Sequence, residues 1–567
     1  MLKGIGASHG YGIGKIVKIE EADLTYEERR IENTEEEIKR FQNAVDTFSE
    51  RTMSMAEDMR SRVGGKEAEI LEGHVMMVQD PFLTDEVTGK IKTGICAERA
   101  LEEVCEMFIQ MFSATEDELT GQRITDIKDI QSRLLKILLG KEEVDISTVP
   151  ENTILAAKDL TPSMTVGIRK ENVVGILTEV GGKTSHSAIL ARALEVPAVL
   201  SVKDIMQQVT NGQEAIIDGK EGWVLLNPME EEKDAYLAKR NAYLEEKEAL
   251  KQLLGKPTLT GDGEKVELVC NIGKPEDSNA VIEQDGEGVG LFRTEFLFMD
   301  RNKMPTEEEQ FEAYKKVAVT LEGKPVIIRT LDVGGDKEIP YMGFEKEDNP
   351  FLGYRAIRVC LDQKEMYRKQ LRALLRASAF GDIRIMVPMI TCVEELREVK
   401  EMVEELKKEL SQNSISYNEN IPIGVMIETP SAVMIADILA KEADFFSIGT
   451  NDLTQYIMAV DRGNAKVAYL YSTYNPAVLR AIQHVIACGR KEGILVGMCG
   501  EAAADPLLIP LLLSYGLQEF SVSATSVLAT RNIISKWTKE EANALAEKVH
   551  ELATEKEVVE LLEKSCK

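Results

Sequence analysis

The chain has 567 residues, which is too long for a single hydrophobic core and predicts two or three domains. Its 97 acidic and 68 basic side chains give a formal net charge of −29, which argues against nucleic acid or an anionic membrane as the principal partner. The acidic surface permits docking of a basic protein, although many soluble proteins are simply acidic.

The first residues lack the apolar core of a signal peptide, and no run approaches the roughly 20 apolar residues of a membrane span. We therefore expect a cytoplasmic protein. The eight cysteines are scattered without CxxC spacing, so neither a zinc site nor a disulfide framework is expected.

Residues 1 to about 20 are rich in glycine and predict strands and turns that do not form a compact β unit of their own. From about Tyr26 the apolar residues recur at helical spacing, and further helical patterns run to about Gly140. Three of these patterns cover residues 67–79, 98–112 and 127–139. The simplest interpretation is an all-helical subdomain inserted into a small α/β domain.

The α/β pattern resumes near Thr153 and ends at Pro228, and residues 214–219 and 222–226 form a hairpin-like pair within it. A charged helix with apolar residues at intervals of seven is predicted between 229 and 254. This helix is either a rigid or bending linker between two domains or an ordinary amphipathic packing helix, and both interpretations remain open.

After Pro257, short apolar runs alternate with helical segments to the end of the chain. The runs cover residues 266–270, 288–292, 326–328, 383–387, 423–427, 445–448, 494–498 and 520–523. Eight strands that alternate with helices predict a (β/α)8 TIM-type barrel, whose active site lies at the carboxyl ends of the strands. An open doubly wound sheet is the alternative.

A histidine lies at the start of a predicted helix in the α/β region. His186 follows two glycines and the strand-like run 173–177, and Thr184 or Ser185 can cap the helix. Unpaired amides and the positive end of the helix dipole suit a phosphoryl group attached to the ring. The neutral imidazole is nucleophilic, although by position alone such a histidine is more often a cap or a surface residue.

Charged side chains directly follow several of the eight apolar runs, so they converge on one rim of the predicted barrel. They lie in residues 293–295, 329–332, 428–430, 449–452 and 499–501. Arginines match phosphate and carboxylate groups, and paired acids hold a divalent cation, so the rim fits a small doubly anionic substrate. Asp332 and Lys337 flank a glycine turn that is equally well explained as a flexible loop.

Each rim residue type suggests a role in phosphoryl transfer. Glu428 and Asp452 would coordinate Mg²⁺, and the backbone near Asn451 would add donors. A mostly protonated thiol at Cys499 would protonate an enolate, although a strand-end cysteine is more often a packing residue. The arginines that would neutralise phosphate and carboxylate are Arg293, Arg329, Arg355 and Arg462.

The segment GGKTSHSAILARALEVPAV resembles the phosphohistidine segment shared by enzyme I of the sugar phosphotransferase system, pyruvate, phosphate dikinase and phosphoenolpyruvate synthase. Six further segments resemble the successive motifs of enzyme I, in its order: GVGLFRTEFLFMDR, IIRTLDVGGDK, NPFLGYRAIR, GVMIETPSAV, FFSIGTNDLTQYIMAVDR and GMCGEAAADP. The resemblance covers nearly the whole chain.

The resemblance implies that His186 takes a phosphoryl group from phosphoenolpyruvate, releasing pyruvate, and passes it to a histidine of the phosphocarrier HPr for coupled sugar uptake. It implies Mg²⁺ at Glu428 and Asp452, Cys499 as the acid that completes pyruvate, and a homodimer formed through the barrel. Phosphoenolpyruvate contacts are implied at Arg293, Arg329, Asn451, Asp452 and Arg462, with Arg355 near the phosphate.

The part before the histidine separates enzyme I from the dikinases, because about 180 residues without a P-loop precede His186. The helical subdomain resembles the HPr-docking site of enzyme I, which places His74, Arg123 and Lys128 near the partner surface. Lys128 stands where many members carry arginine. We expect no sensory domain of the nitrogen-regulatory paralogue. A nucleotide-using dikinase and a non-catalytic phosphosignalling scaffold are the alternative functions.

The expected domains are a phosphohistidine α/β domain (1–20 and 146–227), an HPr-binding helical subdomain (21–145), a helical linker (228–257) and a phosphoenolpyruvate-binding barrel and dimerisation domain (258–567). One histidine cannot face both the barrel rim and the docking subdomain. We therefore expect a rigid-body swing of the α/β domain, with hinges near 21–25, 141–146 and 228–257.

Overall fold

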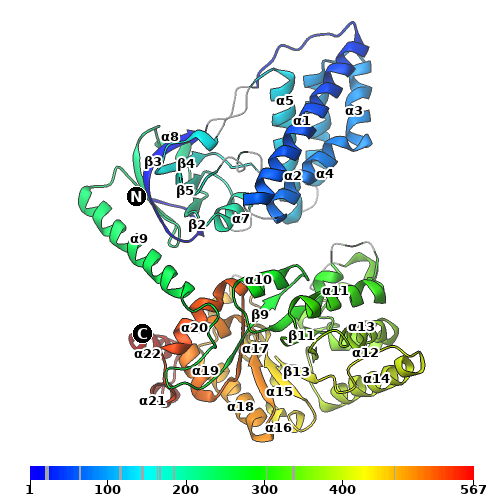
Figure 1. Cartoon of the computed structure of the whole chain (residues 1–567), viewed down its shortest axis with the longest axis vertical. Helices are drawn as coiled ribbons and strands as arrows, with labels where there is room; N and C mark the ends of the chain where they lie inside the picture. Colours follow the sequence, from blue (N-terminus) through cyan, green and yellow to red (C-terminus); the bar gives the residue numbers. More distant parts are fainter. Residues whose placement is uncertain are drawn as a thin grey trace. The chain divides into compact units, whose positions relative to one another are not determined.

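The computed structural model describes residues 1–19, 24–62, 65–113, 118–141, 146–161, 164, 168–182, 185–299, 301, 303–334, 339–464 and 466–566. The chain divides into two compact units, Met1–Lys247 and Glu248–Lys567 (Figure 1). Within the described residues, no helix has the length and apolar character needed to cross a membrane. The predicted hinges at 21–25 and 141–146 lie mostly outside the described residues and stay predictions.

Among its described residues, the first unit carries an eight-stranded sheet in the order β1-β8-β7-β3-β4-β5-β6-β2. The four strands from β3 to β6 are parallel, and the flanking pairs are antiparallel. The glycine-rich start therefore joins this sheet, and the predicted hairpin is confirmed as β7 and β8. The strands are Leu2–Lys3 (β1), Ile5–Ser8 (β2), Tyr11–Ile19 (β3), Thr153–Ala157 (β4), Val173–Thr178 (β5), Ala198–Leu200 (β6), Glu214–Asp218 (β7) and Trp223–Leu226 (β8).

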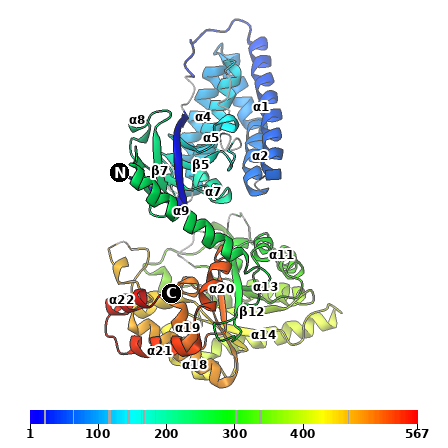
Figure 2. The same cartoon turned by 60° about the vertical axis from the view of Figure 1, so that its left-hand side comes forward.

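A bundle of helices is inserted between β3 and β4, which confirms the predicted all-helical subdomain (Figures 1 and 2). Phe41, Phe48 and Leu101 lie fully buried in its core. The helices are α1 (Thr34–Arg62), α2 (Gly65–Gln79), α3 (Pro81–Lys92), α4 (Ala97–Ser113) and α5 (Glu118–Leu138).

The first helix begins later than the apolar spacing predicts. The apolar spacing predicts a start near Tyr26, whereas α1 starts at Thr34. The Asn33 side chain accepts a hydrogen bond from the Glu36 amide at 3.2 Å, which caps this end of the helix. Tyr26 packs against the bundle from the preceding segment, so its ring is partly buried without belonging to the helix.

Helices α7 (His186–Ala193) and α8 (Ile205–Gln208) complete the α/β part, and α9 spans Glu230–Lys251. No residue of α9 is buried in the described chain. The rings of Tyr236 and Tyr243 each form a T-shaped contact with the ring of Tyr11, at centroid distances of 6.0 and 6.3 Å. Packing thus accounts for the first part of α9, and the boundary between the two units falls near its end. The linker role of 228–257 stays a prediction.

The second unit is the predicted barrel. All of its described strands are parallel neighbours and close in the order β10-β11-β12-β13-β14-β15-β16-β9. The closed barrel excludes the alternative of an open sheet. The strands are Glu267–Ile272 (β9), Val289–Arg293 (β10), Val326–Arg329 (β11), Ile383–Val387 (β12), Ile423–Ile427 (β13), Phe445–Ile448 (β14), Leu495–Met498 (β15) and Glu519–Val522 (β16).

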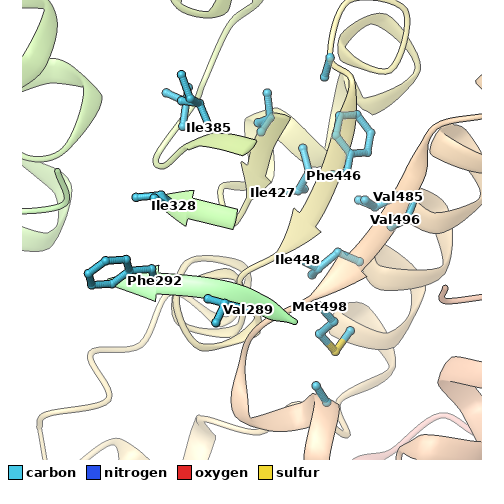
Figure 3. Packing of buried hydrophobic residues seen from close by; sticks show 14 of the residues in the cluster. Val289, Phe292, Ile328, Ile385, Ile427, Phe446, Ile448, Val485, Val496 and Met498 are labelled. Atoms are coloured by element: carbon cyan, nitrogen blue, oxygen red, sulfur yellow. The ribbon is translucent and has the colours of Figure 1, made fainter. Parts of the chain in front are cut away.

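Alternate strand residues face outward and form the main core with the surrounding helices. In Figure 3, Val485 of α18 lies beside Val496 of β15, and Phe292 and Ile328 extend from neighbouring strands. The helices of this unit are α10 (Asp277–Glu283), α11 (Glu307–Thr320), α12 (Ile357–Asp362), α13 (Lys364–Ala377), α14 (Val393–Gln412), α15 (Pro430–Met434), α16 (Ala436–Leu439), α17 (Thr450–Met458), α18 (Pro476–Glu492), α19 (Ile509–Tyr515), α20 (Val527–Ser535), α21 (Lys539–His550) and α22 (Glu555–Ser565).

The amino-terminal ends of the barrel strands bury an unusual carboxyl group. Glu519 starts β16 opposite Glu267 of β9, so the two like side chains share one face. Both carboxyl oxygens of Glu519 are buried without a hydrogen-bond partner among the described residues. Burial and then the charge of Glu267 raise the pKa of Glu519 to about 7, whereas Arg384 lowers it.

We predict that Glu519→Gln stabilises the barrel at about pH 8 and has a smaller effect at about pH 5. A carboxyl whose pKa is raised by folding contributes its full stability below the unfolded pKa of 4.5 and loses it as the pH rises through about 7. Urea unfolding would be followed through Trp537 in a Trp223→Phe background, because these are the two tryptophans of the chain.

The control is Glu404→Gln, which removes an exposed carboxylate paired with Lys407 on the barrel surface. It should change the unfolding free energy little at either pH. An equal effect of Glu519→Gln at both pH values would contradict the prediction.

Candidate active site

A cavity of about 170 Å³ opens at the carboxyl ends of the barrel strands. Strand ends and the start of α17 supply most of its wall, as expected for an active site in this type of barrel. The wall contains every barrel residue that the sequence predicts for the site: Arg293, Arg329, Arg355, Glu428, Asn451, Asp452, Arg462 and Cys499.

Two buried carboxylates hold two of the arginines in the cavity wall. Arg329 Nη2 donates to Glu295 Oε1 at 2.6 Å, and its Nη1 lies 2.9 Å from Asp332 Oδ2. Arg355 Nη2 donates to the other oxygen of Asp332 at 2.8 Å. Burial lowers the pKa of both arginines, but the neighbouring carboxylates outweigh it and raise both, so both guanidinium groups stay charged.

The other two arginines are less enclosed. Arg293 ends β10 at the cavity wall and is half-buried. The Arg462 side chain is 39% exposed, and its Nη2 lies 3.9 Å from Asp452 Oδ1. The cavity therefore has two arginines fixed at its base and two that are closer to solvent.

Glu428 and Asp452 form a carboxylate pair in the same wall. The Met389 amide donates to Glu428 Oε1 at 2.7 Å. A Cβ at position 449 would lie 2.8 Å from Glu428 Oε2, so Gly449 leaves the room that this carboxylate needs. Burial, followed by the charges of Asp452 and Asp332, raises the pKa of Glu428 to about 8.

These two residues fit a magnesium ion. Carboxylate oxygens are the ligands that Mg²⁺ prefers, and one or two of them commonly share the ion with substrate phosphate oxygens. Asp452 Oδ1 is buried and has no hydrogen-bond partner in the described part of the chain. A cation at this position would satisfy that oxygen and offset the repulsion that raises the pKa of Glu428.

Cys499 follows β15 and is 3% exposed. Its Sγ lies 3.8 Å from the carbonyl oxygen of Ile448. Burial raises the pKa of the Cys499 thiol to about 11, so the thiol is protonated at neutral pH. A protonated thiol in the wall of the cavity has the proton that an acid catalyst requires.

In the first unit, His186 is the first residue of α7, as predicted, and its side chain lies outside the described part. Ser185 is the N-cap residue, and its hydroxyl accepts from the Ala188 amide at 3.4 Å. Gly181 has a φ of +112°, a conformation that favours glycine. The Ser187 hydroxyl donates to the carbonyl oxygen of Leu160 at 3.2 Å, which ties the first turn to the chain after β4. Thr184 lies outside the described residues.

The predicted partner residues of the helical bundle differ in exposure. Arg123 and Lys128 are exposed on α5. His74 is only 1% exposed, and its Nε2 lies 3.1 Å from Asp126 Oδ1. His74 thus lies beneath the surface and joins α2 to α5. The roles of all three toward a partner stay predictions.

Several wall residues were not assigned a role from the sequence. The sequence marks Glu295 and Asp332 as residues that follow strands, and Asp332 also as flanking a glycine turn, but it assigns no role in the cavity to either of them or to Phe351. The positions of these residues in the sequence do not predict their contacts in the cavity, because Asp332 pairs with arginines from two separate segments. Lys337, predicted beside Asp332, lies outside the described residues.

A cationic cavity with a carboxylate pair in one unit, and a histidine at a helix start in the other, suit a phosphotransferase that uses a small phosphorylated acid. Family profiles agree. They match the PEP-utilising enzyme N-terminal domain at 3–123, the mobile domain at 149–222 and the PEP-binding domain at 247–539.

Curated relatives match over the whole chain. Phosphoenolpyruvate-protein phosphotransferase of Bacillus subtilis (strain 168) is 48% identical over 567 residues, covering 100% of both chains. The protein of the same name from Priestia megaterium is 46% identical over 99% of this chain and 98% of its own. That from Staphylococcus carnosus (strain TM300) is 45% identical over 100% of this chain and 99% of its own. The chain belongs to the phosphoenolpyruvate-protein phosphotransferase (enzyme I) family, which confirms the resemblance.

We predict that Asp332→Ala lowers the unfolding free energy of the barrel by about 3–5 kcal/mol, because two buried guanidinium groups lose the carboxylate between them. Urea unfolding followed through Trp537 measures the change. The control is Glu442→Ala, which breaks a bridge to Arg397, a side chain that is 56% exposed, and should cost about 1 kcal/mol or less. Equal costs for the two variants would show that Asp332 does not compensate buried charge.

Proposed function

We propose that the chain phosphorylates itself on His186 from phosphoenolpyruvate, releases pyruvate, and passes the phosphoryl group to a histidine of HPr. The cavity at the barrel rim carries this proposal. Four arginines, two carboxylates and a protonated thiol share a space of about 170 Å³, which suits a substrate with one phosphate and one carboxylate.

Arg329 and Arg355 are held by Glu295 and Asp332 before any substrate binds. Fixed guanidinium groups need little reorganisation to bind a phosphate, which favours electrostatic stabilisation of the transferring group. Arg293 and Arg462, nearer to solvent, complete the neutralisation of the two anionic groups. The start of α17 adds backbone donors near Asn451, because first-turn amides have no partner within the helix.

Glu428 and Asp452 hold Mg²⁺ in this proposal, and the ion when bound neutralises charge on the phosphoryl and enolate oxygens. The bond between phosphorus and the enol oxygen breaks as a bond between phosphorus and an imidazole nitrogen of His186 forms. Cys499 then gives its proton to C3 of the enolate, which yields pyruvate. The thiolate recovers a proton from solvent.

The first turn of α7 suits the phosphorylated histidine. Amides after the N-cap Ser185 and the helix dipole favour a negative charge next to the ring. The imidazole must then meet two surfaces in turn, namely the barrel rim and the helical bundle. The proposal therefore includes a swing of the α/β domain as a rigid body. It uses the domain limits given above: 1–20 and 146–227 for the α/β domain, 21–145 for the helical subdomain, 228–257 for the linker and 258–567 for the barrel. The proposal also includes a homodimer formed through the barrel and a role of Arg123 and Lys128 in HPr binding.

We predict that His186→Ala abolishes covalent labelling by phosphoenolpyruvate that carries radioactive phosphate, because the accepting nitrogen is lost. The same variant should keep the rise in thermal midpoint that phosphoenolpyruvate and Mg²⁺ cause, because the barrel cavity is unchanged. His9→Ala is the matched control, since His9 is an exposed histidine of the same unit. It should be labelled like the unaltered chain and pass its label to HPr.

Three results would overturn the proposal. Label on His186→Ala would place the phosphoryl group elsewhere. Binding of HPr by a chain that never takes label would indicate a scaffold. Phosphorylation of pyruvate that requires ATP would indicate a dikinase.

A further inference from the structure

The cavity arginines Arg293 and Arg329 end neighbouring strands and are the last register pair of the described β10–β11 ladder. Beyond this pair the two segments continue as Thr294 and as Thr330 and Leu331, and neither belongs to a strand. Some other interaction must therefore hold the two strand ends at a fixed spacing. The structure supplies it from α13, on the side of the strands away from the cavity.

The side chain of Gln370 lies between the two segments and is 1% exposed. Its Oε1 accepts a hydrogen bond from the Leu331 amide at 3.0 Å, and its Nε2 donates to Thr294 Oγ1 at 3.2 Å. Thr294 Oγ1 in turn donates to the carbonyl oxygen of Arg329 at 2.8 Å. These three bonds link the residue that follows Arg293 to both sides of Thr330.

The second Nε2 hydrogen also has a partner. Gln370 Nε2 lies 3.2 Å from the Tyr314 hydroxyl of α11, which donates to Gln310 Oε1 at 3.2 Å. The amide thus uses both of its donor hydrogens and its acceptor in a buried network. Gln370 is absent from the cavity wall, so it acts on a substrate only through other residues.

We propose that Gln370 is a positioning residue that sets the spacing of Arg293 and Arg329 for the phosphate of the substrate. The inference rests on the proposed function of the rim cavity and deepens it. An amide is required because it accepts from Leu331 and donates to Thr294 at once, whereas an ionised carboxylate only accepts and a thioether does neither well.

The test is Gln370→Met in the full chain, with steady-state transfer from phosphoenolpyruvate to HPr as the readout. Methionine has a similar length but removes the hydrogen bonds of Gln370 to Leu331, Thr294 and Tyr314. Arg293 and Arg329 would bind the phosphate in both the ground state and the transition state. Displacing them therefore raises KM more than it lowers kcat. We expect KM for phosphoenolpyruvate to rise about tenfold or more, with kcat within about threefold.

Asn271 offers a matched control on β9, the strand that neighbours β10 in the barrel. Its Nδ2 donates to the carbonyl oxygens of Cys499 and Ser521, each at 3.2 Å, and its Oδ1 accepts from the Ser521 hydroxyl at 2.6 Å. Asn271→Leu therefore removes three side-chain hydrogen bonds, and these go to the residue after β15 and to β16 rather than to β10 or β11. Its KM for phosphoenolpyruvate should stay within about threefold of the unaltered chain.

Gln370→Glu adds a signature that mere loss of stability does not give. A protonated glutamic acid can accept from Leu331 and donate to Thr294, whereas the ionised form loses the donor. The KM of this variant should fall as the pH is lowered, relative to the unaltered chain at each pH. This readout also serves if Gln370→Met does not fold.

An unchanged KM in Gln370→Met, or an equal rise in KM in Asn271→Leu, would overturn the inference. So would a Gln370→Glu variant whose KM follows the unaltered chain at every pH. Failure of the proposed function gives a different result, because the unaltered chain would then take no label from phosphoenolpyruvate.

Discussion

The cavity at the barrel rim depends on keeping several positively charged arginines close together in a small space from which much of the water is excluded. Guanidinium groups that converge within about 170 Å³ repel one another strongly where the dielectric constant is low. Asp332 resolves part of this conflict, because its two oxygens bind Arg329 and Arg355 separately. Glu295 forms a second ion pair with Arg329, through Nη2 of the guanidinium group. The site is thus balanced before substrate arrives, and the more exposed arginines carry the charge that remains for a ligand.

The barrel converts this local balance into a site. Parallel strands end at one rim, so side chains that are far apart in sequence meet there without a special turn for each. The same geometry leaves strand-end backbone without ladder partners, and the side-chain amides of the buried Gln370 and the half-buried Asn271 bind these groups instead. At the opposite end, Glu519 has no such partner, which fits the general separation of catalytic and structural ends in this fold.

Much of this architecture follows from the sequence, because an apolar run bounded by turn residues has few alternatives as a strand. Each of the eight predicted barrel strands overlaps the observed one, and the residues that follow them line the cavity. The sequence also predicts an N-cap at Thr184 or Ser185, because a hydroxyl side chain just before a helical pattern can accept from a first-turn amide, and the structure places the cap at Ser185.

What the sequence did not reveal depends on contacts between distant segments. The burial of His74 requires knowing that α5 covers it with Asp126 and Asp129. The bridge at Asp332 requires the position of Arg355. Gln370 did leave a signal, because it is a polar residue on the buried face of α13 beside Leu371 and Leu374, but its partners could not be read from spacing.

Helix α9 imposes a constraint of a different kind. With 22 residues it is about 33 Å long, and none of its described residues is buried. Substitutions at its exposed positions therefore encounter few packing penalties, whereas Tyr236 and Tyr243 contact Tyr11 of the same unit. The spacing of these two rings is fixed, because one residue inserted or deleted between them would turn Tyr243 by about 100° relative to Tyr236 and shift it by about 1.5 Å. Natural variation in this segment should accordingly be rich in exchanges and poor in gaps.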